Sequence, residues 1–364
     1  MESKTHGFGT IAIHAGEPSD MSGIPIYQVA TYHGEYTRED NPTIAGLEQK
    51  IAALEGGEKA MAAASGMAAI SHTLLALLQA GDRLICHYDV YISCFNLFKE
   101  SMPRVGIEIV PIDMRDLNQL KEALLEETQV VYVETISNPT LDISDIKAIA
   151  EIAHEADAKV VVDNTFLTPY LLRPFELGAD VVIHSATKFL SGHGDSVGGL
   201  VISDEETITA IKKVRSNYGG IISPFNAFLI MRGMKTLPLR IAQHCANALA
   251  VSEFLSQHPK VTSVRYGALK SDPDHDIAAH ELPKGCGGMV GFILNGAAVG
   301  AKAFVSNLKI CKNWVSLGDV QTLVIWHDEE PERRVPEGYL RLSVGLEDIE
   351  DIIEDLTQAL DCVP

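Results

Sequence analysis

Short apolar runs alternate with helical patterns between about residues 60 and 203 of this 364-residue chain. The apolar runs are "DRLICHY", "GIEIVPID", "QVVYVETI", "AKVVVDNT", "ADVVIHSATK" and "GGLVISD". Between them lie "FNLFKESM", "DLNQLKEALLEE" and "ISDIKAIAEIAHEADA", whose apolar residues recur at three- to four-residue spacing. Strands and helices in this order favour a largely parallel sheet that is covered on both faces. In such sheets ligands gather at the carboxyl ends of the strands.

The two flanking regions have other patterns. Residues 1–43 are rich in Gly, Pro, Tyr and Thr without a helical period, which predicts an arm. After the helical stretch "IAQHCANALAVSEFLSQHP", the strands "VTSVRYG", "GGMVGFILN" and "YLRLSVG" alternate with "AAVGAKAFVSNLKI" and "EDIEDIIEDLTQAL". The patterns therefore predict an α/β protein with an arm (1–43), a large α/β domain (44–230) and a smaller C-terminal α+β domain (231–364).

Composition narrows the class of protein. A formal charge of −20 and a pI near 5.0 argue against a nucleic-acid or anionic-membrane partner, which would need a clustered basic face. The amino terminus lacks the apolar segment of a leader, so we expect cytoplasmic residence. The six cysteines form no CxxC and have no histidine at ligand spacing, which predicts buried reduced thiols and no metal. The charged stretch "DEEPERR" indicates a solvated loop.

Lys188 stands at the end of the apolar run "GADVVIHSATK", an unfavourable place for an ammonium group. It is either a surface residue or a desolvated, reactive amine. The hydroxyls of Ser185 and Thr187 lie beside it, which suits a phosphate-bearing aldehyde cofactor. Asp163 ends the preceding strand and has the side chain that a protonated pyridine nitrogen requires. An Asp after a strand is also a common turn or helix cap.

A second candidate for the phosphate is the start of the helix "SGMAAISHTLLALL". Gly66 and Met67 follow Ser65 there, and glycine lets the backbone N–H groups approach an anion, although a simple cap has the same sequence. The glycine-rich "GHGDSVGG" is one residue too long for a dinucleotide fingerprint and does not open a βα turn.

Many ordered stretches of the chain resemble one family. They include "PIYQVATY", "YTREDNPT", "LEQKIAALEGGEKAMAAASGMAAI", "ETISNPTLDISDI", "VVDNTFLTPYLLRPFELGADVVIHSATKFLSGHGD", "SPFNAFLIMRGMKTLPLR", "VSLGD" and "YLRLSVGLEDIEDII". The family is that of the pyridoxal 5'-phosphate (PLP) enzymes of cysteine and methionine metabolism. It contains cystathionine γ-synthase, the cystathionine lyases, methionine γ-lyase and the O-acylhomoserine sulfhydrylases.

The resemblance implies a PLP-dependent transferase fold of the aspartate aminotransferase type, fold type I, with PLP as cofactor. Lys188 would form the Schiff base with the cofactor and move protons, and Asp163 would pair with the pyridine nitrogen. The remaining implied roles are phosphate binding by Gly66, Met67, Ser185 and Thr187, ring stacking and acid–base work by Tyr91, ring contact by Asn138, and substrate binding by Arg341 and Ser316.

The arm has its own implied role. In the family it reaches the cofactor phosphate of a neighbouring subunit, so Tyr36 and Arg38 would complete the partner's site. The resemblance therefore implies a homo-oligomer, usually a tetramer built from two dimers. An ordinary exposed arm is the alternative for these two residues.

Three segments depart from the family pattern. "YISC" replaces a run of small residues after Tyr91, and Arg215 with Ser216 stands where methionine γ-lyases carry a Lys-Asp pair. The third is "VQTLVIWHDEEPERRVPEGY", a shorter segment in place of a loop that contains Thr-His, which predicts a remodelled lid. Val315 is shared with methionine γ-lyases and sulfhydrylases.

Elimination or replacement at Cγ of a sulfur-containing or O-acylated L-amino acid is therefore the expected function. A C–S β-lyase acting on cystathionine or cysteine is the alternative, because it needs the same cofactor and one deprotonation fewer. A non-catalytic PLP-fold protein is a third possibility, against which the joint presence of Lys188, Asp163, Tyr91 and Arg341 speaks.

Overall fold

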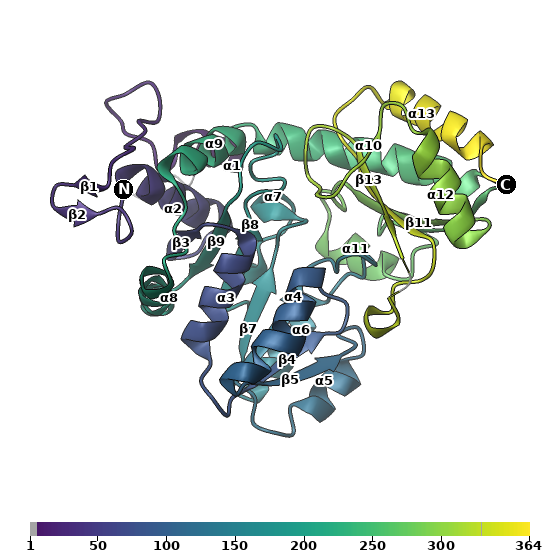
Figure 1. Cartoon of the computed structure of the whole chain (residues 1–364). Coiled ribbons are helices and arrows are strands. Elements are labelled where there is room, and N and C mark those ends of the chain that lie inside the picture. Colours follow the sequence, from purple (N-terminus) through teal and green to yellow (C-terminus); the bar gives the residue numbers. More distant parts are fainter. Residues whose placement is uncertain (1–5, 329) are drawn as a thin grey trace.

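The computed structural model describes residues 6–328 and 330–364, and a seven-stranded sheet forms its larger half (Figure 1). The strand order is β3-β9-β8-β7-β6-β4-β5. The strands are β3 (Lys59–Ala63), β4 (Arg83–His87), β5 (Glu108–Ile112), β6 (Val130–Glu134), β7 (Lys159–Asp163), β8 (Val181–Ser185) and β9 (Gly199–Ser203). The strands are parallel except for β9, which is antiparallel to both β3 and β8. The predicted α/β fold is thereby confirmed.

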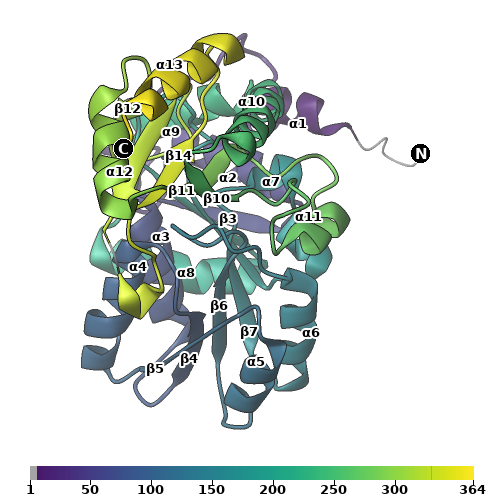
Figure 2. The ribbon, with the colours of Figure 1, turned by 90° about the vertical axis from the view of Figure 1, so that its right-hand side faces the viewer.

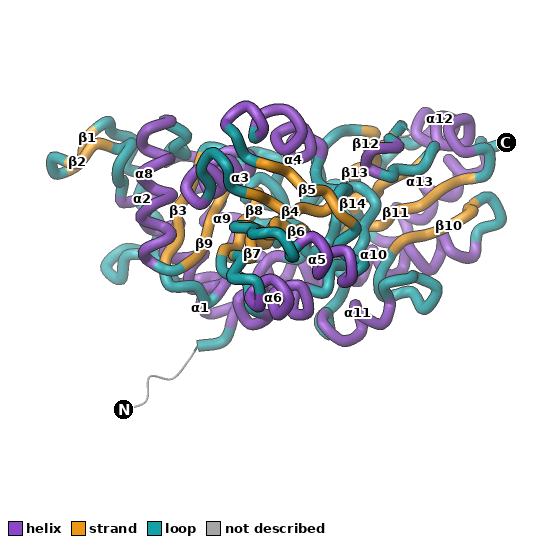
Figure 3. The backbone as a smooth tube through the Cα atoms, turned by 90° about the horizontal axis from the view of Figure 1, so that it is seen from below, coloured by secondary structure: helices purple, strands orange, loops and turns teal. Residues whose placement is uncertain are grey.

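Helices cover both faces of this sheet, as the view along its edge shows (Figure 3). One face packs against α3 (Gly66–Leu77), α4 (Ile92–Asn96), the π-helix η1 (Leu97–Ser101) and α8 (Glu205–Tyr218). The other face packs against α5 (Leu117–Ala123) and α6 (Ile146–Glu155). Because β6 is buried along its whole length, its sequence is a continuous Val-rich run rather than an alternating one. The short helices η2 (Pro103–Val105), α7 (Thr168–Leu171) and η3 (Pro174–Leu177) complete this half.

A five-stranded sheet of order β10-β11-β14-β13-β12 forms the smaller half, which lies above the parallel strands in Figure 2. Its strands are β10 (Val261–Arg265), β11 (Met289–Leu294), β12 (Lys312–Asn313), β13 (Leu323–His327) and β14 (Tyr339–Ser343). The helices of this half are α10 (Leu237–Gln257), α11 (His275–Glu281), α12 (Ala297–Asn307), η4 (Pro331–Arg333) and α13 (Ile349–Asp361). The sheet is mainly antiparallel, with β12 parallel to β13.

The amino-terminal region contains α1 (Phe8–His14) and a short hairpin of β1 (Thr31–Tyr32) and β2 (Glu35–Tyr36). It leads into α2 (Pro42–Glu55), which lies beside α9 (Pro224–Met234). The predicted domain boundaries at 43 and 230 stay predictions. No helix in residues 6–328 and 330–364 is long and apolar enough to span a membrane.

Two details differ from or go beyond the sequence-based expectations. The segment "VQTLVIWHDEEPERRVPEGY" was expected to be a remodelled lid, and no strand was predicted in it, yet its residues Leu323–His327 form β13 and pair with β14. Its apolar residues Leu323 and Val324 are buried, because strand pairing places them in the core. The charged composition of the neighbouring residues gives no sign of this burial. Four of the cysteines are buried as predicted, whereas Cys245 is half-buried and Cys362 is exposed.

The parallel strands bring chemically important residues to one edge. Glu134, Asp163 and Ser185 are the last residues of β6, β7 and β8. Ser65, which caps α3, follows the end of β3 at the same edge. Because parallel neighbours end on the same side, residues that lie up to about 120 positions apart in the chain meet there.

Arg240 on α10 fixes the segment that follows β8. Its guanidinium donates to the carbonyl oxygens of Phe189 (2.7 Å), Leu190 (3.3 Å) and Gly233 (2.8 Å). Gly192 has a φ of +71°, and a Cβ there would collide with this guanidinium, so glycine is required. Lys188 thus lies between a buried strand and a backbone turn held by a buried arginine.

We predict that Arg240→Ala destabilises the protein by about 2–4 kcal/mol, because three carbonyl groups lose a buried donor. The matched control is Arg232→Ala, which removes an exposed arginine from α9. Thermal unfolding followed by circular dichroism should show a midpoint several degrees lower for the first variant only. Equal midpoints for the two variants would contradict this role of Arg240.

Candidate active site

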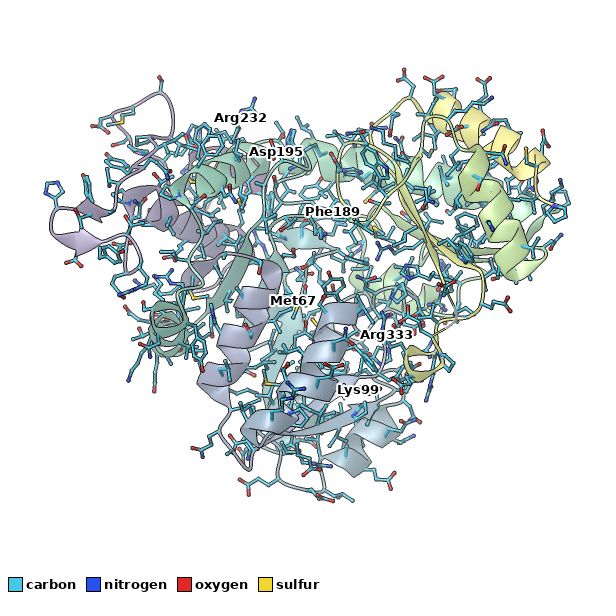
Figure 4. The ribbon with its side chains drawn as sticks, in the orientation of Figure 1. Met67, Lys99, Phe189, Asp195, Arg232 and Arg333 are labelled. Carbon is cyan, nitrogen blue, oxygen red and sulfur yellow. The ribbon has the colours of Figure 1, made fainter. Side chains whose placement is uncertain are left out.

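A cavity of about 490 Å³ lies where the carboxyl ends of β6, β7 and β8 meet residues from the five-stranded sheet. Residues from both halves line it, among them Met67 on α3 and Arg333 in η4, which are labelled in Figure 4. The predicted residues that line it are Gly66, Met67, Tyr91, Asn138, Asp163, Ser185, Thr187, Lys188, Ser316 and Arg341. The fold therefore brings these ten residues, predicted from the sequence, into one space.

Lys188 presents its amine to this cavity. Its Nζ donates to Ser316 Oγ at 2.8 Å. Burial, followed by the positive charge of Arg341, lowers the pKa of the Lys188 amine to about 8. Of the two readings of Lys188 that the sequence left open, the geometry supports a desolvated amine. Such an amine is neutral in a useful fraction of molecules near neutral pH, which is what a nucleophile or proton acceptor requires.

The backbone of Ser316 is strained. Its φ is +90°, in a region that residues with a Cβ rarely adopt. The carbonyl oxygen of Ser316 accepts a hydrogen bond from Arg341 at 3.3 Å, while its hydroxyl accepts from Lys188. The strained residue therefore links the two cationic groups of the cavity.

Asp163 is the last residue of β7 and carries the carboxylate at that edge of the cavity. One of its oxygens accepts from the Thr165 N–H at 3.0 Å and from the Thr165 hydroxyl at 2.5 Å, and the other accepts from Tyr132 at 3.4 Å. Burial raises the pKa of Asp163, and the hydrogen bonds from Thr165 oppose that shift. A cation placed against this carboxylate would restore its charged form.

The amino terminus of α3 forms an anion-binding cradle. The Ser65 side chain accepts from the Ala68 N–H at 3.1 Å. The N–H groups of Gly66 and Met67 have no helical partner, because they lie in the first turn of the helix. A Cβ on Gly66 would lie 2.8 Å from Ser185 Cβ, so only glycine allows this close approach of helix and strand. The hydroxyls of Ser185 and Thr187 line the same cavity. This donor set suits a phosphate group.

Arg341 on β14 carries the second cationic group. Its guanidinium donates to Asn138 Oδ1 in a short contact and to the Ser316 carbonyl, whereas its buried Nε has no partner among the described residues. Burial lowers the pKa of Arg341 to about 10, so the group stays charged at neutral pH. A buried donor without a partner is costly unless a ligand accepts from it, and a carboxylate is the natural acceptor.

Glu134 is a site residue that the sequence analysis missed. Its two oxygens accept from the backbone N–H groups of Tyr91 (2.9 Å) and Asn138 (3.0 Å). Burial, then the neighbouring Asp163, raises the pKa of Glu134 well above its ordinary range. Its position as the polar last residue of a Val-rich strand is the same signal that marked Asp163. Through these contacts Glu134 holds the segment of Tyr91, whose side chain is 41% exposed at the cavity.

The interpretation of "DEEPERR" as a solvated loop was wrong for Glu330 and Arg333. Arg333 is 2% exposed, and both residues line the cavity together with His327. Arg333 donates to the carbonyls of Val90 (3.1 Å) and Asn138 (2.6 Å) and to the Glu330 carboxylate (2.6 Å). These partners are distant in the sequence, which explains why local charge composition suggested solvation. Glu332 and Arg334 are exposed, as expected.

Tyr36 and Arg38 do not line this cavity. Tyr36 is 48% exposed, and the Arg38 guanidinium lies 5.2 Å from the centre of its ring. Arg215, one of the departures from the family pattern, is buried and donates to Glu48 (3.2 Å) and to the Glu39 carbonyl (2.9 Å). It therefore ties the end of the arm to the large sheet.

Taken together, these groups fit a phosphate-bearing aromatic aldehyde. The amine of Lys188, the Asp163 carboxylate and the Gly66 cradle provide one partner each for an aldehyde, a ring nitrogen and a phosphate. No group of three or more metal-ligating side chains occurs in the described part of the chain, and the absence of a metal stays a prediction.

Comparisons with known proteins agree with this donor set. The sequence profile of the family described as "Cys/Met metabolism PLP-dependent enzyme" matches residues 9–361. An L-methionine gamma-lyase of Fusobacterium nucleatum subsp. polymorphum is 42% identical, covering 99% of this chain and 100% of that protein. A cystathionine gamma-synthase of Mycobacterium bovis is 41% identical over 97% of both chains. The crystal structure of metB from Corynebacterium glutamicum superposes with a TM-score of 0.94 at 38% identity, over 98% of each chain.

We predict that the cofactor-free protein captures PLP at a rate that rises with pH, with a midpoint at about pH 8, and levels off above it, because the ammonium form of Lys188 is not nucleophilic. Removing the second cause of the shift with Arg341→Met should move the midpoint to higher pH, whereas Lys302→Met, at an exposed position on α12, should leave it unchanged. The measurement is the rate of change of cofactor absorbance. A midpoint near the ordinary lysine pKa of about 10.4 would contradict the effect of burial.

Proposed function

The chain belongs to the Cys/Met metabolism PLP-dependent enzymes, and we propose that it eliminates or replaces the substituent at Cγ of a sulfur-containing or O-acylated L-amino acid. Near-full-length similarity to both an L-methionine gamma-lyase and a cystathionine gamma-synthase supports this class of reaction. The observation that carries the proposal is the presence of Lys188 and Arg341 in one cavity, linked through Ser316. Together they offer a basic amine and a carboxylate-binding group.

Pyridoxal 5'-phosphate is the cofactor of this family, and when bound it stores the electron pair released from the substrate. We assign its aldehyde to Lys188, its ring nitrogen to Asp163 and its phosphate to Gly66, Met67, Ser185 and Thr187. Tyr91 and Asn138 would contact the ring. The assignment is supported by the donor types and their burial around the cavity.

Arg341 would bind the α-carboxylate of the substrate. Its planar fork is held by Asn138 and the Ser316 carbonyl, so it would lose little freedom when it binds. This contact would place Cα next to Lys188, because the Lys188 amine and the Arg341 guanidinium share the Ser316 residue.

Lys188 would then move two protons. The neutral amine would accept the proton from Cα and would have to pass it on to the bound cofactor before it could, neutral again, accept a second proton from Cβ and so allow the γ-substituent to leave. Tyr91 lines the cavity and is 41% exposed, and it would donate a proton to the leaving group. The same residues would suffice for a β-lyase, which stops after the first deprotonation, but no contact in the cavity favours that reaction over the one at Cγ.

We further propose a homo-oligomer in which Tyr36 and Arg38 complete the site of a neighbouring subunit, with a tetramer as the expected assembly. The exposure of Tyr91, Ile92, Val197 and Val315 at the cavity supports a covering partner, because these side chains are apolar. Cytoplasmic residence stays a prediction.

The direct test offers the PLP-saturated protein L-methionine, O-acetyl-L-homoserine and L-cystathionine separately, with and without an added thiol, and identifies products by mass spectrometry. We expect 2-oxobutyrate or a new thioether from at least one of them. Lys188→Ala should lower kcat by at least about 10³-fold, because no other residue can take over both proton transfers. Pyruvate from cystathionine would instead indicate β-elimination.

A second test addresses the shared site. Arg38→Ala and Lys188→Ala should each be inactive alone. Co-expression of the two variants should restore about a quarter of the wild-type activity, because about half of the dimers would be mixed and each mixed dimer would have one intact site of two. Mixing Lys188→Ala with the double variant of both positions is the control and should stay inactive. Absence of recovery in the first mixture would contradict a shared site.

A further inference from the structure

One side of the cavity is formed by His327, Glu330 and Arg333, which we call the Glu330 wall. These residues come from the end of β13 and from η4, within the segment that departs from the family pattern. Arg333 donates to the Val90 carbonyl, one residue before Tyr91. The Glu330 wall is therefore attached to the segment of the residue expected to serve the leaving group. In Figure 4 Arg333 lies close to Lys99, whose amine contacts Glu332 of the same turn at 2.6 Å.

The positive charge of Arg333 is already balanced. Each of its three nitrogen atoms donates a hydrogen bond, to Val90, Glu330 and Asn138. One oxygen of Asp89, which is fully buried, lies 3.6 Å from the Arg333 guanidinium. The other oxygen of Asp89 accepts from Ser137 at 3.1 Å and from Thr140. Burial raises the pKa of Asp89, and the hydrogen bond from Thr140 and the charge of Arg333 oppose that shift. Arg333 is thus a poor site for an anionic part of a substrate.

Glu330, by contrast, keeps one oxygen free for a ligand. Its Oε2 accepts from Arg333. Among the described residues, its Oε1 has only His327 Nδ1 nearby, at 3.9 Å, which is too far for a hydrogen bond. His327 is neutral near pH 7, because burial and then the charges of Arg341 and Arg333 lower its pKa to about 3. Its buried Nε2 has no partner in the described residues. The groups of the Glu330 wall that remain able to contact a ligand are therefore a carboxylate oxygen and a neutral imidazole.

We propose that Glu330 makes the enzyme select substrates whose γ-substituent carries no negative charge, with substituents that end in a cationic or N–H donor group preferred over neutral ones. The inference rests on the proposed chemistry at Cγ and names its substrate class. A substituent carboxylate would meet the free Glu330 oxygen, which can only accept hydrogen bonds. Because every nitrogen of Arg333 already donates elsewhere, the two carboxylates would face each other without a shared donor. A thioether or small ester would pack on Ile92, Val315 and Ile325, which line the same cavity.

The test uses two esters with the same leaving bond. O-acetyl-L-homoserine and O-succinyl-L-homoserine differ by a CH2–COO⁻ group, so the ratio of their kcat/KM values reports both its charge and its size, and the change of that ratio in a Glu330 variant isolates the effect of the Glu330 charge. We expect the wild-type holoenzyme to favour the acetyl ester by at least about tenfold. Glu330→Gln should lower this ratio severalfold. Glu332→Gln is the matched control, because it removes the same charge from an exposed position two residues away and should leave the ratio unchanged.

Equal use of both esters by the wild type, or a ratio that Glu330→Gln does not change, would overturn the inference while leaving the chemistry at Cγ intact. If neither these esters nor L-methionine nor L-cystathionine is consumed, the proposed function itself fails. The two failures are therefore distinguishable.

Binding measurements test the wall without turnover and without a variant. L-norleucine, L-2-aminoadipate and L-ornithine have side chains of matched length that end in a methyl, a carboxylate and an ammonium group. Titration of each into the wild-type holoenzyme, followed by cofactor absorbance, should rank affinity as ornithine, then norleucine, then aminoadipate. Tightest binding of aminoadipate would overturn the inference directly.

Discussion

Removing an ammonium group from water is costly, and the structure half-buries Lys188 shortly after the end of the central strand β8. Burial and then the nearby Arg341 guanidinium lower the pKa of the Lys188 amine to about 8. Such an amine needs a rigid support, because any movement toward solvent would restore its ordinary pKa. The support comes from β8, from the Ser316 hydroxyl at 2.8 Å and from Arg240, which holds the carbonyl groups that follow Lys188. The reactive amine thus depends on both halves of the molecule.

The same dependence explains why acidic and basic groups alternate around the cavity. Glu134 and Asp163 lie at the ends of neighbouring strands, where burial raises the pKa of both carboxyl groups. Arg341 and Arg333 come from the other half and both donate to Asn138, one to its side chain and one to its carbonyl. Asn138 therefore connects the carboxyl edge of the large sheet with the residues of the smaller sheet. A substrate carboxylate and a cationic ring would complete this pattern, since each would supply a missing counter-charge.

Much of the large half could be predicted from sequence, because its strands are continuous apolar runs and its reactive groups stand where those runs end. Lys188 and Asp163 were found in this way, while Asn138, Ser316 and Arg341 were found only through resemblance to a family. Glu330, Arg333 and β13 could not be found, since the partners that bury Arg333 are backbone carbonyls of Val90 and Asn138. Those carbonyls lie about 200 residues or more away in the chain, and they leave no signal in the charged sequence itself. Glu134 carried the same strand-end signal as Asp163 and was nevertheless overlooked.

The central claim is that one amine, Lys188, removes protons from both Cα and Cβ of an amino acid. The most direct measurement is hydrogen exchange of L-norleucine, which has no leaving group, in D₂O with the PLP-saturated protein, followed by NMR. The account predicts loss of both the Cα and the Cβ proton signals with the wild type, and of neither with Lys188→Ala. Exchange at Cα alone would contradict chemistry at Cγ, and exchange that persists in the variant would contradict the assignment of the base.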